Sequence, residues 1–196
     1  MALLGFAAAM WWRQSGQAAP VTLATGTMIE PRRELPDFSL LDLHGAAFTR
    51  ESLRGHWSLL FFGYTNCPDV CPTTLSTLAA LARNLEQAHP KAIPQVVFVS
   101  VDARRDTPDV LARYVPYFHA GFNGVTAPTQ AGIEDFARRM GVAVMIGEEH
   151  EGTYSVDHSA AIFVIAPDAR LAAILTGPHT IAALGADWSR ILESAP

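Results

Sequence analysis

Two apolar runs on either side of an amphipathic stretch constrain the fold of this chain most. Residues 57–62 read WSLLFF and residues 96–101 read VVFVSV, the near-continuous apolar pattern of strands buried on both faces. Between them, apolar residues recur at spacings of three, four and three, as on one face of a helix that runs to about residue 88. These residues are Leu75, Leu78, Ala82 and Leu85. The strand–helix–strand order predicts two parallel strands joined by a right-handed crossover.

The flanking segments extend this unit at both ends. A hairpin is expected at residues 38–48, a helix over residues 107–118 and a short helix over residues 133–140. Residues 160–175 predict a strand, a turn and a second strand, and residues 180–194 predict a terminal helix. The expected fold class is therefore α/β and thioredoxin-like, with a central mixed sheet flanked by helices on both faces, an N-terminal β-hairpin and an α insertion.

The length and charge of the chain limit what it can do. Its 196 residues suit one domain with a modest extension, and we expect the extension over residues 1–34 and the folded domain over residues 35–196. Residues 14–34 lack periodicity, which is typical of a tether. The net charge is -5 and the pI is about 5.7, so no basic surface is expected to neutralise phosphates. These properties argue against nucleic acid as a partner.

The N-terminal segment suggests contact with a membrane. The first twelve residues, MALLGFAAAMWW, are apolar or glycine, and Arg13 is the first charged residue. A helix of this length rises only about 18 Å, against a hydrocarbon core of about 30 Å. The segment also lacks the basic start and the small-residue cleavage site of a signal peptide. We interpret it as a shortened membrane anchor, with a disordered apolar tail as the alternative.

The only two cysteines lie in the stretch NCPDVCP, residues 66–72, directly after the first buried strand. In open α/β sheets, ligands and chemistry collect at that end of the strands. A helix that starts at Pro68 or Pro72 places one or both thiols in its first turn, where free N–H groups and the helix dipole favour a thiolate, so a lowered pKa is expected. If both cysteines are helical, their spacing accommodates either a disulfide or a shared metal ion. The spacing alone does not choose between them.

A metal ion would need a third ligand, and His158 is the histidine best placed to supply it. His158 lies in the stretch VDHS, immediately before the strand expected at residues 160–165. In the expected fold this loop faces the start of the first helix, so His158 is either a ligand or a hydrogen-bonded loop histidine. Two thiolates and one imidazole suit Cu(I) and can also hold Cu(II), whereas zinc normally takes a fourth ligand. Copper is therefore the better fit.

Three stretches together resemble the Sco/SenC family of copper proteins. They are FFGYTNCPDVCP at residues 61–72, SVDARRDTP at residues 100–108 and VDHS at residues 156–159. The resemblance extends over roughly residues 35–192. Members of this family are membrane-tethered proteins with a thioredoxin fold, and they are implicated in assembling the dinuclear copper centre of cytochrome c oxidase subunit II. Ala103 and Ala169 stand where the family usually has proline and glycine.

The resemblance implies a site and a role. Cys67, Cys71 and His158 would bind one copper ion per chain, as Cu(I), Cu(II) or both. Asp102 would hydrogen-bond near the site and hold its loop rather than ligate. The implied function is that of a metallochaperone at the periplasmic face of a bacterial inner membrane, attached through its N-terminus. It would deliver copper to subunit II or to another copper-receiving protein, maintain the thiols of that target, or do both, and an upstream periplasmic protein would donate the copper.

Alternatives remain for Asp102 and for the cysteines. Asp102 could instead cap a helix or pair with Arg104 or Arg105. A metal-independent thiol–disulfide oxidoreductase would use Cys67 and Cys71 as its redox-active pair, although thioredoxins have a shorter cysteine spacing and a proline in the loop where this chain has a histidine. A peroxiredoxin-like peroxidase or redox sensor would trap a sulfenate as a disulfide between the same cysteines.

Overall fold

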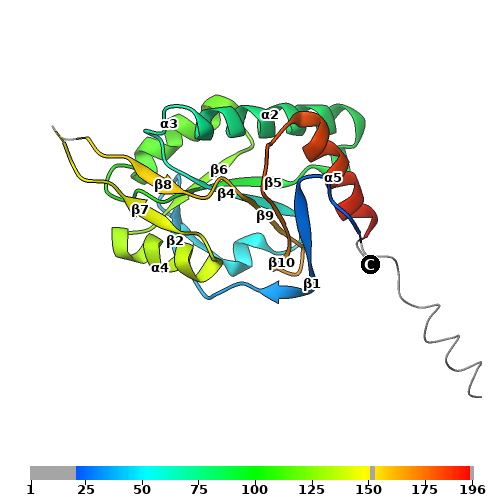
Figure 1. Ribbon diagram of the computed structural model, residues 1–196, viewed down its shortest axis with the longest axis horizontal. Coiled ribbons are helices and arrows are strands. Elements are labelled where there is room, and N and C mark those ends of the chain that lie inside the picture. The colour runs from blue at the N-terminus through cyan, green and yellow to red at the C-terminus, as the bar shows by residue number, and fades with distance from the viewer. Residues whose placement is uncertain (1–20, 151–152, 195–196) are drawn as a thin grey trace, which may run out of the picture.

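A mixed eight-stranded sheet forms the centre of the computed structural model, which describes residues 21–150 and 153–194 (Figure 1). The strand order is β1-β10-β9-β4-β5-β6-β2-β3, and β7 and β8 form a separate two-stranded sheet. The strands are β1 (Gly26–Glu34), β2 (Ser39–Asp42), β3 (Ala47–Thr49), β4 (Ser58–Gly63), β5 (Gln95–Ser100), β6 (Asn123–Thr126), β7 (Val144–Ile146), β8 (Val156–His158), β9 (Ile162–Ile165) and β10 (Arg170–Leu175). Because β4, β5 and β6 run parallel, their carboxyl ends meet at one edge of the sheet.

Helices cover both faces of the sheet, as the sequence predicts. They are α2 (Val70–Ala88), α3 (Pro108–Phe118), α4 (Gln130–Met140) and α5 (Ile181–Glu193), with short 3-10 helices η1 (Arg50–Leu53) and η2 (Pro90–Ala92). Figure 1 shows α2, α3 and α5 on one side of the sheet and α4 on the other. A threonine precedes each of α3, α4 and α5, and its side chain accepts a hydrogen bond from a backbone N–H of the first turn. These caps fix where the three helices begin.

Strand β4 is apolar because both of its faces are covered. Phe61 packs against Phe98 of β5, with ring centroids 6.1 Å apart. Its neighbour Phe62 packs against Phe136 of α4 at 5.9 Å and against Phe163 of β9 at 5.4 Å. All residues of β4 are buried, and β4 pairs in parallel with β5. The expected strand–helix–strand unit is thereby confirmed.

Strand β1 lies ahead of residue 35, where the sequence predicts the start of the folded domain. Residues 26–34 belong to the sheet rather than to a tether, because both ends of β1 pair antiparallel with β10. Ahead of β1, Leu23 is buried in the core. The side chains of β1 are mostly exposed or half-buried, as in an edge strand, so its sequence lacks a clear apolar alternation. The expected apolar segment of residues 1–12 and the first part of the tether lie outside the described residues.

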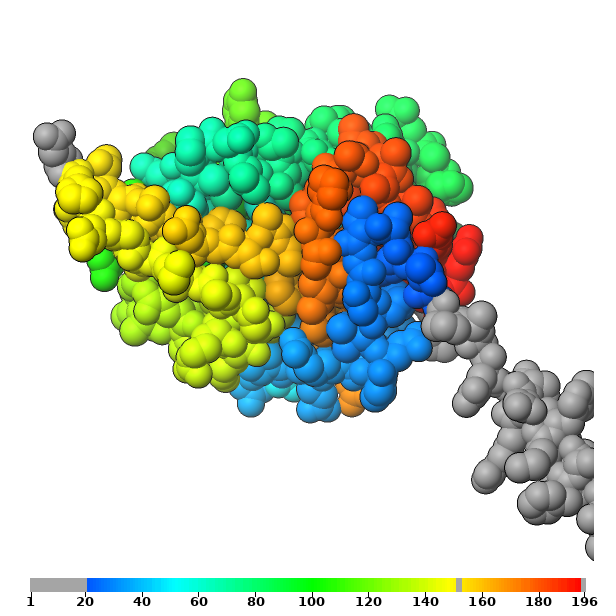
Figure 2. Space-filling model, viewed as in Figure 1, coloured from blue at the N-terminus to red at the C-terminus, as the bar shows by residue number. Residues whose placement is uncertain are grey.

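The sequence also does not predict β6 or the hairpin of β7 and β8. These strands contain only three or four residues each, and a period of two cannot be recognised over so short a run. Figure 2 shows the hairpin at one end of the molecule, where the chain projects from the main body. Over the described part of the chain, no helix combines the length and the apolar character needed to cross a bilayer.

Candidate metal centre

The two cysteines lie where β4 passes into α2. After β4 ends, the backbone N–H of Cys67 donates a hydrogen bond to the carbonyl oxygen of Tyr64 at 3.3 Å. Helix α2 begins at Val70, between the two starting points that the sequence allows. Cys67 therefore lies in the loop and is partly exposed, whereas Cys71 is the second residue of the helix and is completely buried. Both thiols are free, and only one of them is accessible from solvent.

Gly63 makes room for the buried sulfur. A Cβ atom at this position would lie 3.0 Å from Sγ of Cys71 and 2.5 Å from the ring of Phe98. A packed interior has no space for such contacts without a shift of the neighbouring atoms. The glycine that ends β4 therefore allows the Cys71 sulfur to lie against the end of the strand.

Cys71 and His158 lie side by side although 87 residues separate them in the chain. Sγ of Cys71 is 3.7 Å from Nε2 of His158. The other ring nitrogen, Nδ1, donates a hydrogen bond to the carbonyl oxygen of Ser159 at 2.9 Å. Because a neutral imidazole carries one proton, this bond leaves the lone pair of Nε2 facing the sulfur. The expectation that His158 faces the start of the first helix is confirmed, although His158 is the last residue of strand β8 and not part of a loop.

Cys67 is close to this pair but not yet part of it. Its Sγ accepts a hydrogen bond from the backbone N–H of Cys71 at 3.4 Å. Within residues 21–150 and 153–194, no three His, Cys, Asp or Glu side chains are already close enough together to hold a metal ion. We therefore expect the side chain of Cys67 to turn toward the other two donors when an ion binds.

The separation of Cys71 and His158 is one that a metal ion can span. Taking zinc as a guide, bonds of about 2.3 Å to sulfur and about 2.0 Å to nitrogen join donors 3.7 Å apart at an angle of about 120°. Thiolate and imidazole are also ligands that copper accepts. Cys71 and His158 therefore fit a copper ion, and Cys67, whose sulfur accepts a hydrogen bond from the backbone of Cys71, would be the third donor.

The burial of Cys71 contradicts the expectation that its thiol has a lowered pKa. Burial raises the pKa of the Cys71 thiol far above its ordinary value, and a hydrogen bond with the backbone of Tyr64 opposes this only in part. Loss of water thus outweighs the position at the start of α2. Burial also lowers the pKa of His158. Both groups are therefore neutral at neutral pH, and a bound ion must displace the proton of the thiol.

Asp102 contacts the loop that leads to His158. Its buried carboxylate forms an ion pair with Arg105 and accepts a hydrogen bond from Oη of Tyr154 at 2.7 Å. Thr107, not Asp102, caps α3. Of the interpretations offered for Asp102, the structure contains both the ion pair with Arg105 and a hydrogen bond to the loop that leads to His158, but not the helix cap.

Asp106 is a second buried carboxylate, and the sequence does not single it out. It accepts hydrogen bonds from the backbone N–H of Thr65 at 2.9 Å, from the Thr65 hydroxyl at 2.6 Å and from the Ser100 hydroxyl at 2.6 Å. Burial raises the pKa of its carboxyl group, and these hydrogen bonds oppose the shift. The only sequence signal is an acidic residue just before Thr107, a pattern more typical of an exposed turn.

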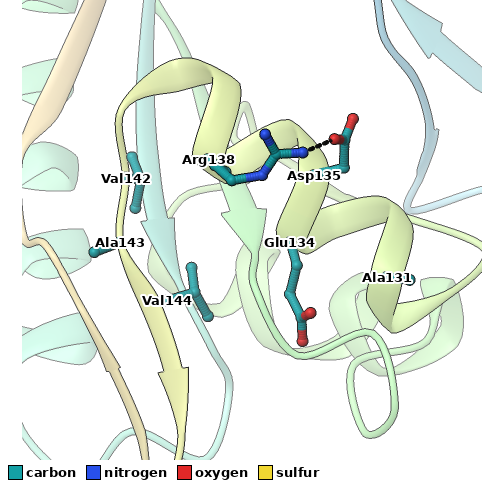
Figure 3. A pocket seen from close by; sticks show the side chains of 7 residues that line it. All are labelled: Ala131, Glu134, Asp135, Arg138, Val142, Ala143 and Val144. Atoms are coloured by element: carbon teal, nitrogen blue, oxygen red, sulfur yellow. Dashed lines mark hydrogen bonds and ion pairs between the residues drawn. The ribbon is translucent and has the colours of Figure 1, made fainter.

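A surface hollow between α4 and β7 is separate from these residues. Figure 3 shows the side chains of Glu134, Asp135 and Arg138 around it, with Arg138 paired to Asp135. Its lining contains neither cysteine nor histidine. It therefore adds no soft donor to the metal centre.

Fold and site together define a class of protein, a thioredoxin-like chain with a dithiol at a strand–helix junction and a histidine against its buried thiol. A family model described as SCO1/SenC matches residues 26–193, and the chain belongs to this family. The match starts at the first residue of β1, in agreement with the corrected start of the folded domain.

Solved structures share this architecture. The crystal structure of Arabidopsis thaliana ScoI with copper bound has a TM-score of 0.77 and 31% sequence identity, and the match covers 82% of this chain and 98% of that chain. The structure of Bradyrhizobium japonicum ScoI with copper bound has a TM-score of 0.71 and 32% identity, with coverage of 81% and 99%. The expected thioredoxin-like fold is therefore confirmed.

Curated relatives agree with the family assignment. A Stutzerimonas stutzeri protein whose name refers to copper binding is 35% identical over 168 residues, which is 85% of this chain and 81% of that protein. The protein SCO2 homolog, mitochondrial, of Bos taurus is 42% identical over 134 residues, or 67% of this chain. The match spans 50% of the length of that mitochondrial relative.

Proposed function

We propose that this chain is a copper metallochaperone whose single copper ion is held by Cys67, Cys71 and His158. The contact of 3.7 Å between Sγ of Cys71 and Nε2 of His158 carries the proposal. The two related structures with copper bound, from plant and bacterium, support copper as the ion. The thiolates favour Cu(I), and the imidazole extends the site to Cu(II).

We further propose that the ion passes to subunit II of cytochrome c oxidase, at its dinuclear copper centre, or to another copper-receiving protein. Membership of the SCO1/SenC family supports this target. The unequal access of the two thiols suits transfer, because the partly exposed Cys67 can exchange ligands with a partner while Cys71 stays covered. An upstream periplasmic protein would load the site in the same manner.

The proposed location is the periplasmic face of the bacterial inner membrane, with attachment through the apolar residues 1–12. The composition of MALLGFAAAMWW supports attachment. Membrane fractionation of the full chain and of a chain without these twelve residues tests it. Recovery of both forms in the aqueous fraction would contradict attachment.

Copper titration of the reduced protein tests the three ligands. The full chain is expected to bind one copper ion, and Cys67→Ser or Cys71→Ser to abolish tight binding of Cu(I). His158→Ala is expected to keep Cu(I) but to weaken Cu(II) and change its absorption spectrum. His150→Ala is the matched control, because that side chain is 81% exposed on the hairpin loop. An unchanged Cu(II) affinity and spectrum in His158→Ala would refute the three-ligand site.

A second candidate is a thiol–disulfide oxidoreductase, which the exposed and buried pair of thiols favours. The thiolate of Cys67 would attack a target disulfide, releasing one target thiolate and forming a mixed disulfide. Cys71, after losing its proton, would then attack Sγ of Cys67 and release the second target thiolate. The target would gain two electrons and this chain would end with a disulfide between Cys67 and Cys71.

Reduction of a disulfide substrate by copper-free protein separates the two candidates. An oxidoreductase is expected to turn over substrate in the presence of a copper chelator and to keep that activity in His158→Ala. Because the pKa of the Cys71 thiol is raised, turnover should accelerate with rising pH. No turnover without copper at any pH would eliminate this candidate.

A further inference from the structure

A five-residue segment of the connection between β5 and α3 contacts both halves of the metal centre. This segment, residues 102–106, carries two carboxylates that are completely buried, Asp102 and Asp106, and the guanidinium group of Arg105. Asp106 binds the loop that contains Cys67, and Asp102 with Arg105 binds Tyr154 in the loop that leads to His158. One short segment thus joins two parts of the site that are far apart in sequence.

The first of these connections fixes the cysteine loop. Asp106 accepts both the backbone N–H and the hydroxyl hydrogen of Thr65, at 2.9 and 2.6 Å. Thr65 lies two residues before Cys67. Ser100, the last residue of β5, donates a third hydrogen bond to the same carboxylate. A buried carboxylate that receives three hydrogen bonds holds its partners firmly, because leaving any of them unpaired is costly.

The second connection fixes the hairpin that carries the histidine. Nη1 of Arg105 donates to the carbonyl oxygen of Tyr154 at 3.1 Å, and Oη of Tyr154 donates to Asp102 at 2.7 Å. The guanidinium carbon lies 3.7 Å from the centroid of the Tyr154 ring, a stacked cation–π contact. It also lies 5.7 Å from the centroid of Tyr64, whose ring meets the His158 ring edge-on at 6.0 Å.

The hairpin needs such a support. Strands β7 and β8 pair only with each other in a two-stranded sheet outside the main sheet (Figure 1). An isolated two-stranded hairpin is at best marginally stable in water. Val156 is buried in the core, but the only strand pairing of β8 is with β7. Tyr154, four residues before His158, is one point at which the hairpin is held to the rest of the molecule, beside the buried Val156 and the packing of β7 on α4.

We propose that residues 102–106 act as a bracket that sets the distance between the cysteine loop and His158, with Arg105 and Tyr154 as positioning residues for the imidazole. The proposal rests on the copper site proposed above. Cu(I) bound by two thiolates does not depend on the hairpin, whereas Cu(II) depends on the imidazole. Loss of the Tyr154 connection therefore weakens Cu(II) selectively.

Two substitutions isolate the hairpin connection. Tyr154→Phe removes the hydrogen bond to Asp102 and keeps the ring, and Arg105→Met removes the guanidinium group and keeps an unbranched side chain. The matched controls are Tyr117→Phe, at a side chain that is 85% exposed on α3, and Arg104→Met, at an exposed position in the same segment. Affinities for Cu(I) and Cu(II), the Cu(II) absorption spectrum and the midpoint of thermal unfolding are measured for all four variants and the parent chain.

The expected result is a roughly 10- to 100-fold loss of Cu(II) affinity with an altered Cu(II) spectrum in Tyr154→Phe and Arg105→Met, at unchanged Cu(I) affinity. The two controls should match the parent chain. An equal Cu(II) affinity and an equal Cu(II) spectrum in all variants would show that residues 102–106 do not position the imidazole of His158. A parallel loss of Cu(I) and Cu(II) affinity together with a lower unfolding midpoint would also overturn the proposal, since that pattern indicates general destabilisation.

Amide hydrogen exchange of the metal-free protein separates this proposal from the copper site on which it rests. In Tyr154→Phe the amides of residues 144–146 and 156–158 should exchange faster than in the parent chain, while those of β4 and β5 stay protected. If the parent chain binds no copper, the proposed function fails, and exchange alone decides whether the bracket holds the hairpin. Unchanged exchange in the hairpin would refute the bracket whatever the copper result.

Discussion

Cys71 is the residue on which the chemistry of the site depends most. Its sulfur lies between the glycine that ends β4 and the imidazole of His158, and no part of the residue is exposed. This position has two consequences. The thiol keeps its proton at neutral pH, because burial raises its pKa. The sulfur also occupies a space that tolerates no additional atom at Gly63.

Copper binding should release a proton from Cys71 and should therefore strengthen as the pH rises. Since the raised pKa keeps this thiol protonated through the neutral range, the apparent affinity for Cu(I) is expected to increase about tenfold per pH unit for each proton displaced. Titrations against a competing chelator between pH 6 and pH 8, with proton release followed by an indicator, measure both quantities. A constant affinity over this range would show that the thiol is already ionised in the free protein.

Substitution of Gly63 by alanine should disturb the site and the core together. The added Cβ atom would lie 2.5 Å from the Phe98 ring and 3.0 Å from Sγ of Cys71, and we expect a loss of about 1–3 kcal/mol in the free energy of unfolding. Urea denaturation measures the loss, and copper titration reports the displaced sulfur. Gly185→Ala in α5 is the matched control, because its nearest atom is 3.9 Å away and helix propensity favours alanine. A destabilised control with an unaffected Gly63→Ala would contradict this account.

At the scale of elements, some segments are held in place by strand pairing within the sheet, and others are held by the hydrogen bonds of a single side chain. Strands β4 and β5 are paired on both sides and covered by helices. Strand β1 lies at an edge of the sheet, and the chain ahead of it is fixed by Asp187 of α5. This buried carboxylate accepts hydrogen bonds from the N–H of Ala24 at 2.5 Å and of Thr25 at 2.9 Å, and from the Thr25 hydroxyl at 2.6 Å.

Removal of the Asp187 carboxylate should loosen the start of β1. Asp187→Ala leaves three donors without their acceptor, so we expect a loss of roughly 3 kcal/mol in the free energy of unfolding. Hydrogen exchange should show faster exchange over residues 24–28 than in β4. Ser189→Ala, two residues later in the same helix, is the control, because its hydroxyl bonds only to the helix carbonyl of Gly185. Equal stability of the two variants would show that Asp187 does not hold this segment.

At the scale of the whole molecule, the chemistry gathers at one edge of the sheet. The cysteine loop follows β4, and the residue 102–106 bracket follows β5, where the carboxyl ends of the parallel strands meet. Strand β1 is the outermost strand on one side of the sheet, and helix α5 packs on α2. The folded unit therefore includes β1.

Truncation tests this boundary. A chain that starts at Val21 should fold and bind copper as the full chain does. A chain that starts at Leu35 lacks β1 and the buried Leu23 and leaves β10 as an unpaired edge, so it should be less stable and should aggregate. Circular dichroism during heating and light scattering measure the two outcomes. A stable, monomeric chain starting at Leu35 would restore the boundary expected from the sequence.

The sequence predicts those features that depend on neighbouring residues. Strand β4 and helix α2 have periodic patterns, and the position of His158 before β9 follows from the order of the elements. The raised pKa of Cys71 is not predictable in this way, because burial depends on Gly63 and on the packing of distant segments. Asp106 is missed for the same reason, since its partners Thr65 and Ser100 are brought to it only by the fold.

Because the two thiols lie at different depths, a partner protein meets them in a fixed order. A partner that carries copper can reach Cys67 first, since Cys71 is completely covered. In the copper site proposed above, Cys67 would therefore be the first thiol to engage an arriving ion and the last to release a departing one.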